Sequence, residues 1–270
     1  MKWPTSTPAA KSWESARPQT KEQKMLPLPE GWVKQEIHAD FHAFHAVPDL
    51  KSAMEKLLMA TCSETHTSDR GQDPVPTGFQ VAAVHRIENH NLWKRYCKVH
   101  HLLDGKTCTA LSRTAGGCAQ TMMKSAMAPD FHKALNEDLN EVYLFHGTSA
   151  DSATKIGNSG FDLVCASEES LYGPGVYLAE MSSKSDEYAV DSSDELRCIL
   201  LCRVLLGETL TLTRGGPGVN AVVTEAVASG LYDSVLGDRQ ACTGTYREFV
   251  AYNADQVYPE YMILYRRVLQ

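Results

Sequence analysis

Three short segments bring polar, aromatic and glycine residues together at spacings that suit the binding of a ligand. In the first, an apolar run over 143–145 predicts a strand that ends in His146-Gly147-Thr148. A histidine at the end of a strand can reach a ligand, and the adjacent glycine lets the bare backbone approach that ligand closely. For this segment taken alone, a purely structural histidine remains the alternative.

The second segment combines a glycine turn with two tyrosines and a serine–lysine pair. Residues 171–179 predict a turn that leads into a short strand containing Tyr177. The helix predicted after it carries Lys184, Ser185 and Tyr188. Two aromatic rings so close in sequence could bind a planar ligand, and a hairpin turn with one buried tyrosine is the alternative.

The third segment, over 246–265, predicts two strands joined by a short turn, and in the second strand Glu260 lies among apolar residues. A carboxylate in an apolar strand is unfavourable unless it is paired or hydrogen-bonded, so such residues are enriched at functional sites. A glutamate on the solvent face of an alternating strand is the alternative. Glu260 is therefore a candidate functional acid.

Together, and in this order, the three segments resemble the catalytic domain of the poly(ADP-ribose) polymerase family. That family has Leu-Phe-His-Gly-Thr, then Gly-x-Gly-x-Tyr-Phe-Ala with a downstream Ser-Lys-Ser-x-x-Tyr, then Tyr-Pro-Glu-Tyr-Leu. The corresponding residues here are 144–148, 173–179, 183–188 and 258–262, with Leu178 in place of the phenylalanine. The resemblance covers about residues 26–268. It is closest in pattern to tankyrases and to macrodomain-associated members that lack the family's regulatory helical domain.

The resemblance implies that the chain consumes NAD+ as a substrate and transfers its ADP-ribose unit to another molecule. The positively charged nicotinamide is already an activated leaving group, so catalysis would consist mainly of positioning the substrate and stabilising the charge that develops on the ribose. His146, Tyr177 and Glu260 would form the catalytic set. Glu260 would accept a hydrogen bond from the ribose 2′-hydroxyl, stabilise the cationic transition state and polarise an acceptor hydroxyl. A glutamate in this role permits elongation to poly(ADP-ribose) without proving it.

The same resemblance assigns the remaining site residues to NAD+ binding. The backbone of Gly147 and the hydroxyl of Ser185 would hold the carboxamide, Tyr177 and Tyr188 would enclose the nicotinamide ring, and His146 would bind the adenosine ribose. Lys184 would lie near the acceptor or the pyrophosphate. The loop over 162–174 would cover the donor. The expected NAD+-binding set is His146, Gly147, Thr148, Tyr177, Lys184, Ser185 and Tyr188.

The elements that must position these residues predict an α+β fold. Apolar periodicity predicts a helix over 49–62 capped by Asp49, a strand over 79–84 and helices over 89–102 and 151–159. Short strands are expected at 142–146, 198–206, 247–252 and 258–266. The resemblance implies the ADP-ribosyltransferase fold, in which two packed, mainly antiparallel sheets form an NAD+-binding cleft flanked by helices. Residues 1–25 have the composition of a disordered or linker lead-in, and 26–268 form the catalytic domain.

Composition narrows the classes of partner and compartment. A formal net charge of -7 does not favour binding to the phosphate backbone of a nucleic acid, so a nucleic-acid partner is not implied. The chain has neither an apolar leader nor a membrane-spanning stretch, and its eight cysteines show no C-x-x-C pair, so a cytoplasmic or nuclear location is expected. The implied partners are NAD+ and acceptor proteins, with automodification included.

No metal is expected. Residues 189–197 lack the cysteine and histidine ligands that tankyrases carry after the Ser-Lys-Ser helix. His38, His42 and His45 would share one face if their segment were helical, but no fourth ligand accompanies them, so a structural or surface role is favoured.

Two other functions remain open. One is a non-catalytic module that binds NAD+ or ADP-ribose, and the other is an NAD+ glycohydrolase in which water takes the acceptor's place.

Overall fold

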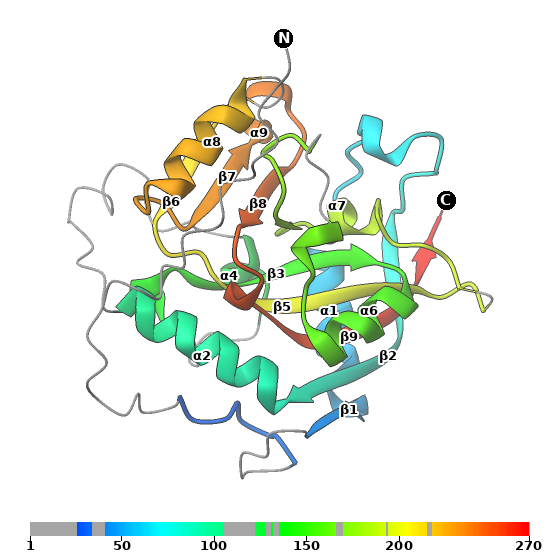
Figure 1. The fold of residues 1–270 in the computed structure, drawn as a ribbon. Helices are drawn as coiled ribbons and strands as arrows, with labels where there is room; N and C mark the ends of the chain where they lie inside the picture. The colour runs from blue at the N-terminus through cyan, green and yellow to red at the C-terminus, as the bar shows by residue number, and fades with distance from the viewer. Residues whose placement is uncertain are drawn as a thin grey trace.

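The computed structural model describes residues 26–33, 41–104, 122–127, 131, 135–165, 170–192, 194–214 and 218–269. The expected lead-in over 1–25 and the expected surface role of His38 lie outside these residues. Nine strands in two sheets form the centre of the described part (Figure 1).

The larger sheet has five strands in the order β1-β2-β9-β5-β3, and every neighbouring pair is antiparallel. Phe79, Val81 and Val84 of β2 are buried, as are the alternate residues Ile263 and Tyr265 of β9. All nine residues of β5 are buried, which explains its nearly continuous apolar sequence. The strands are β1 (His42–Ala46), β2 (Gly78–Asn89), β3 (Glu141–Thr148), β5 (Arg197–Leu205) and β9 (Val257–Val268).

The smaller sheet has four strands in the order β4-β8-β7-β6, and only the β6–β7 pair is parallel. The prediction of two mainly antiparallel sheets is therefore confirmed. The strands are β4 (Val176–Leu178), β6 (Thr209–Leu212), β7 (Ser234–Asp238) and β8 (Arg247–Ala251).

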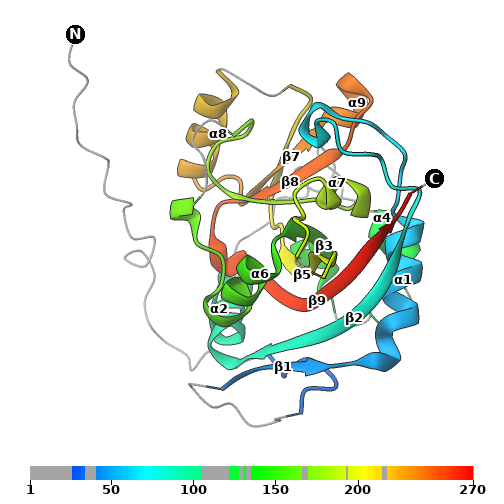
Figure 2. The same cartoon turned by 90° about the vertical axis from the view of Figure 1, so that its right-hand side faces the viewer.

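The two sheets share one hydrophobic core. Leu144 of β3 and Leu200 of β5 belong to the same buried cluster as Leu178 of β4 and Phe249 of β8. In Figure 2 the strands β7 and β8 lie above the long, curved β2 and β9, with β3 and β5 between them. This buried cluster stabilises the packing of β3 against β4. These two strands carry the first two sequence segments.

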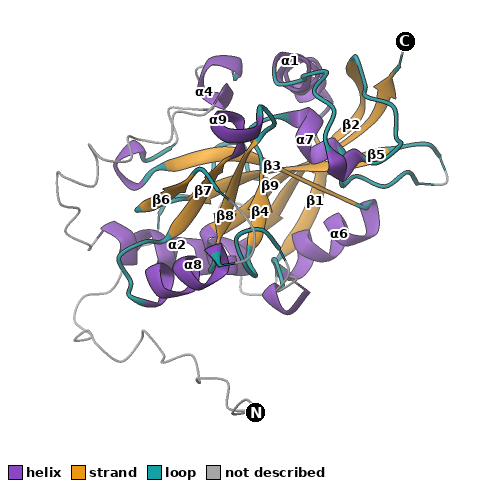
Figure 3. Cartoon of the chain, turned by 90° about the horizontal axis from the view of Figure 1, so that it is seen from above, coloured by secondary structure: helices purple, strands orange, loops and turns teal. Residues whose placement is uncertain are grey.

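Helices surround the strands (Figure 3). Met54, Leu57 and Leu58 of α1 pack with Phe79 and Val81 of β2, as their spacing predicts. The helices are α1 (Lys51–Ala60), α2 (His90–Asp104), α4 (Met122–Ala126), α6 (Ala150–Ser159), α7 (Ser182–Asp186), α8 (Val219–Ala228) and α9 (Arg239–Thr243). Short 3-10 turns occur at η2 (Pro48–Leu50), η3 (Ser68–Arg70), η4 (Glu137–Leu139), η5 (Leu163–Cys165) and η6 (Ala254–Gln256).

One local prediction is wrong. Asp49 does not cap α1, because it lies inside η2 and the N-cap residue is Leu50, which makes no side-chain cap hydrogen bond. His42 and His45 both lie in β1, which pairs with β2, so their spacing does not place them on a helical face.

Candidate active site

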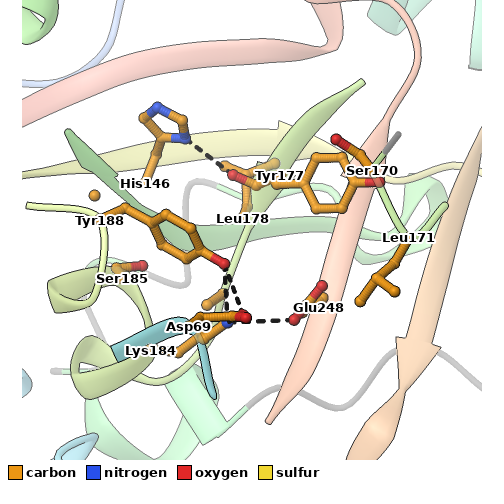
Figure 4. A pocket seen from close by; sticks show the side chains of 12 residues that line it. Asp69, His146, Ser170, Leu171, Tyr177, Leu178, Lys184, Ser185, Tyr188 and Glu248 are labelled. Carbon is orange, nitrogen blue, oxygen red and sulfur yellow. Dashed lines mark hydrogen bonds and ion pairs between the residues drawn. The ribbon is translucent and has the colours of Figure 1, made fainter. Parts of the chain in front are cut away.

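A pocket of about 380 Å³ opens between the two sheets and α7, within the size range of small-molecule sites (Figure 4). It contains most of the residues that the sequence singled out, and several that it did not. The lining residues are Asp69, His146, Gly147, Ser170, Leu171, Tyr177, Leu178, Ala179, Lys184, Ser185, Tyr188 and Glu248.

His146 lies near the end of β3, where the strand passes from the buried core to the pocket. Its Nδ1 is 2.9 Å from the carbonyl oxygen of Tyr177. Because a carbonyl can only accept, Nδ1 carries the proton and Nε2 of the neutral ring is an acceptor. Burial lowers the pKa of His146, although the hydrogen bond to Tyr177 acts in the other direction. The imidazole is therefore neutral at neutral pH and offers an acceptor to a ligand hydroxyl.

Gly147 is required by close packing against α7. A Cβ at this position would overlap the backbone carbonyl oxygen of Ser185. The contact brings the first turn of α7 against the end of β3, so the backbone of Gly147 and the side chain of Ser185 lie in one pocket wall. Thr148 ends β3 but is not among the residues that line the pocket.

Tyr177 is held by its hydroxyl as well as by its strand. The hydroxyl accepts a hydrogen bond from the backbone N–H of Tyr172 and donates one to the carbonyl of Gly173, both at 2.9 Å. Gly173 has a φ of 78°, a conformation that glycine adopts without strain. Burial raises the pKa of Tyr177 to about 12, so the phenol stays neutral. The position of the Tyr177 ring beside the pocket is therefore fixed.

Helix α7 supplies Lys184 and Ser185, and Tyr188 follows it. All five residues of α7 are buried, whereas Tyr188 is 52 % exposed. The Lys184 ammonium donates to Tyr188 Oη at 3.1 Å and lies over its ring. Figure 4 shows the Tyr188 hydroxyl directed towards Asp69 and Lys184. The structure therefore brings His146, Gly147, Tyr177, Lys184, Ser185 and Tyr188 into one cavity.

Glu260 is not in this cavity, so its expected position is wrong. It is 3 % exposed, and its Oε2 accepts hydrogen bonds from Tyr143 at 2.8 Å and Arg203 at 3.0 Å. Glu260 is the extra residue of a β-bulge, because Leu201 pairs with Tyr261 and Cys202 with Pro259. A buried carboxylate beside a buried guanidinium is a structural ion pair in the interior of the larger sheet.

Two carboxylates that the sequence did not indicate line the pocket, those of Asp69 in the loop before β2 and of Glu248. Glu248 lies near the start of β8, two residues before Val250 and so on the same face of the strand. Val250 is the Cα partner of Tyr177, and this register places Glu248 on the pocket side with that tyrosine. The alternation of 247–251 was the available signal, because it separates Glu248 from the core residue Phe249.

Glu248 of β8 belongs to a cluster of charged side chains that also contains Asp69 of η3, Lys184 of α7 and Arg239 of α9. Its Oε1 is 2.9 Å from Arg239 and 3.4 Å from the ammonium of Lys184. Among the residues that the structure describes, its Oε2 has no hydrogen-bond partner. Burial alone would lower the pKa of the Lys184 amine. Tyr188 and the surrounding acids outweigh burial and raise this pKa above the usual range. Lys184 is consequently a permanent cation among the residues that line the pocket.

The loop expected over the donor is only partly described. Ser170 and Leu171 line the pocket, and 166–169 lie outside the described residues. Within the described ranges, no group of three or more His, Cys, Asp or Glu side chains could hold a metal ion. In the same part of the chain, no helix is both long and apolar enough to span a bilayer.

Comparison with known proteins assigns the family. The model for the poly(ADP-ribose) polymerase catalytic domain matches residues 56–267. The protein mono-ADP-ribosyltransferase PARP12 of Homo sapiens is 34 % identical over 233 residues, which are 84 % of this chain and 27 % of that protein. The mouse PARP12 is 28 % identical over 224 residues, covering 82 % of this chain and 26 % of that protein.

A probable poly [ADP-ribose] polymerase of Dictyostelium discoideum is 26 % identical over 204 residues, or 74 % of this chain and 48 % of that protein. The chain thus spans about a quarter to a half of the length of these relatives. The family match covers well over half of the chain and includes β3, β4, α7, β8 and β9. The chain belongs to the poly(ADP-ribose) polymerase catalytic domain family, a family of ADP-ribosyltransferase enzymes that use NAD+.

Proposed function

We propose that this chain transfers ADP-ribose from NAD+ to acceptor proteins, releases nicotinamide, and uses Glu248 as the acid that the sequence reading assigned to Glu260. One observation carries the proposal. A single pocket contains His146 and Tyr177 together with Glu248, whose Oε2 has no hydrogen-bond partner among the described residues. The other carboxylate that lines the pocket, Asp69, already accepts hydrogen bonds from Lys184 and Tyr188. The proposal does not give this role to Glu260, because its carboxylate does not line the pocket and is paired with Arg203 in the protein interior.

The nicotinamide end of NAD+ fits the wall formed by β3, β4 and α7. Tyr177 and Tyr188 both line the pocket, and stacking of an aromatic ring on a flat cationic ring is favourable. The backbone of Gly147 and the hydroxyl of Ser185 are adjacent, and between them they offer a donor and an acceptor for a carboxamide. The neutral Nε2 of His146 would accept from a ribose hydroxyl at the other end of the dinucleotide.

The reaction breaks the bond between the ribose C1′ and the nicotinamide nitrogen. The bonding electron pair leaves with the nitrogen and neutralises its positive charge, while positive charge develops on the ribose. A carboxylate beside the ribose stabilises that charge, and the Oε2 of Glu248 is available for this purpose. An acceptor hydroxyl or carboxylate then forms the new bond to C1′. When the acceptor is a hydroxyl, its proton is drawn towards Glu248.

Glu248 also supports elongation of an attached ADP-ribose unit. The acceptor in elongation is a sugar hydroxyl, which is a weak nucleophile until a base polarises it. An apolar residue at this point of β8 could not polarise it. We therefore infer that the chain can add more than one unit, although two of the relatives named above are called mono-ADP-ribosyltransferases.

Incubation with NAD+ labelled in the adenine tests these assignments. The readouts are label on the chain itself, label on added proteins, the length of any polymer, and free ADP-ribose. The wild type should give protein-bound label, and Glu248→Gln should reduce it by about 100-fold or more. Glu225→Gln, an exposed glutamate on α8, is the matched control and should leave the label unchanged.

The competing functions give different patterns in this assay. Free ADP-ribose without protein-bound label would indicate a glycohydrolase. Binding of NAD+ without turnover would indicate a non-catalytic module. Undiminished transfer by Glu248→Gln would overturn the assignment of the acid, and single units in every product would overturn the inference of elongation.

A cytoplasmic or nuclear location also remains a proposal. The five cysteines whose pairing the structure describes are free thiols, which accords with a reducing compartment. Microscopy of the full-length protein, fused to a fluorescent label, would test it.

A further inference from the structure

Asp69 lies in the pocket although it comes from a segment far from the other site residues in the sequence. It is the middle residue of η3 in the polar loop between α1 and β2. Its Oδ2 accepts a hydrogen bond from Lys184 at 2.6 Å and another from the Tyr188 hydroxyl at 2.9 Å. The same oxygen lies 3.8 Å from Arg239. One carboxylate oxygen thus binds both the hydroxyl of Tyr188 and the ammonium of Lys184, with Arg239 close by.

The loop that carries Asp69 is firmly attached to α7. Arg70 is buried and donates to Asp186 at 2.9 Å and to the carbonyl of Ser183 at 2.7 Å. The preceding Thr67 donates to Glu187 at 2.6 Å. Since the residues on both sides of Asp69 are fixed to the helix, the position of its carboxylate relative to Tyr188 is set by the fold.

Tyr188 needs such a support. The residue is 52 % exposed and follows α7 rather than lying within it, so few core contacts restrict its ring. The hydroxyl is tied to Asp69 and Lys184 at once, and these contacts aim the ring across the pocket (Figure 4). An unrestrained ring would lose conformational entropy each time a ligand stacked on it.

We propose that Asp69 is a positioning residue for the nicotinamide end of NAD+, which it serves by holding the Tyr188 ring in its stacking orientation through the tyrosine hydroxyl. The inference rests on the proposed function, because it assumes that Tyr188 stacks on nicotinamide. Asp69 touches no reacting atom in this scheme. It acts before the chemical step, by reducing the cost of ordering the ring when substrate binds.

Asp69 also forms an ion pair with Lys184. Lys184 is nearer to Asp69 and Glu187, at 2.6 and 2.9 Å, than to Glu248, at 3.4 Å. Glu187 therefore continues to hold the ammonium when Asp69 is replaced, so the surroundings of Glu248 should change little. Burial alone would raise the pKa of Asp69, but the hydrogen bonds from Lys184 and Tyr188 outweigh it and lower that pKa, so the carboxylate is ionised at neutral pH.

Steady-state kinetics on Asp69→Ala, Asp69→Asn and Tyr188→Phe, with the double variant Asp69→Ala/Tyr188→Phe, tests the proposal. Loss of one net hydrogen bond predicts a KM for NAD+ about tenfold higher in Asp69→Ala, with kcat changed by less than about twofold. Asp69→Asn retains an acceptor oxygen and should recover most of the affinity. In the Tyr188→Phe background the effect of Asp69→Ala should disappear, because the hydroxyl through which Asp69 acts is already absent.

Asp73→Ala provides the matched control. Asp73 lies in the same loop and also forms an ion pair, with Arg267 at 3.0 Å, but it does not line the pocket. It should change the thermal midpoint as much as Asp69→Ala does without changing KM. An equal rise in KM for both variants would show that the loop matters only for stability. A full effect of Asp69→Ala in the Tyr188→Phe background would also overturn the inference.

Direct titration with nicotinamide separates this inference from the proposed function. If the wild type binds neither nicotinamide nor NAD+, the proposed function fails, and the inference fails with it. If the wild type binds nicotinamide and turns over NAD+ while Asp69→Ala binds nicotinamide equally well, only the role of Asp69 is refuted. Weaker nicotinamide binding by Asp69→Ala, with Asp73→Ala unchanged, supports both.

Discussion

Tyr177 and Val250 are Cα partners across the β4–β8 pair, and this register decides which acid faces the pocket. Glu248 is two residues from Val250 and therefore points to the side of Tyr177. Glu260 lies one strand further along the chain, in the other sheet, where Arg203 binds it. The two glutamates consequently lie in separate environments, one in the pocket and one in an ion pair inside the larger sheet.

Glu260→Ala should destabilise the fold without a specific effect on catalysis. Removing one partner leaves the buried guanidinium of Arg203 with less compensation, which is expected to lower the free energy of unfolding by about 3–5 kcal/mol. Urea denaturation followed by circular dichroism measures this, with the exposed Glu225→Ala as control. Activity per folded molecule should persist at low temperature. A stable but inactive Glu260→Ala variant would return the catalytic role to this residue.

The affinity for NAD+ should depend on pH through His146. Because burial lowers the pKa of this histidine below the ordinary value of about 6.5, the ring stays neutral at pH 7, and binding should be constant between about pH 7 and 8. At lower pH, protonation converts Nε2 from an acceptor to a donor, and affinity should fall below about pH 6.5. Titrations of NAD+ binding from pH 5 to 8 check this. His146→Asn should bind NAD+ more weakly, and its affinity should no longer fall at low pH. The exposed His66→Gln should show the same fall in affinity at low pH as the wild type.

The same histidine contributes to stability with a defined sign. A folded-state pKa below that of the unfolded chain means that the unfolded state binds the proton more readily. The contribution is therefore fully present above about pH 6.5 and is lost as the pH falls towards the folded-state pKa. The unfolding midpoint in urea should decrease across this range by less in His146→Asn than in the wild type. An equal decrease in both proteins would contradict this sign.

Gly147→Ala should impair ligand binding through the backbone. The added Cβ would overlap the carbonyl of Ser185, so β3 and α7 must separate, and the carboxamide contacts of both residues would be lost together. We expect the KM for NAD+ to rise by about tenfold or more. Gly230→Ala is the control, since its Cβ would meet nothing although its φ is 72°. It should cost about 1 kcal/mol of stability and leave KM unchanged.

Tyr177→Phe and Tyr172→Phe should differ although both remove one hydroxyl. Loss of the Tyr177 hydroxyl leaves the N–H of Tyr172 and the carbonyl of Gly173 without their partner and is expected to cost about 1–3 kcal/mol. The Tyr172 hydroxyl is buried and has no partner among the described residues, so its removal should be neutral or slightly stabilising. Thermal unfolding measures both. Equal destabilisation by the two variants would show that the Tyr177 contacts contribute nothing specific.

The sequence by itself determined the local elements and much of the pocket. The strand that ends in His146 and Gly147, the glycine turn before Tyr177 and the helix with Lys184 and Ser185 depend on periodicity and on single-residue geometry, which neighbours in the chain set. These features also carried the family resemblance, and the structure brings their side chains together.

Only the tertiary structure decided which acids belong to the site. Glu248 and Glu260 both lie in strands that the sequence predicted, but strand pairing and the bulge at Glu260 determine where each carboxylate points. Asp69 reaches the pocket through contacts with residues more than 110 positions away, such as Arg70 with Asp186. Such long-range contacts depend on how distant segments pack, and no local pattern of residue types specifies them.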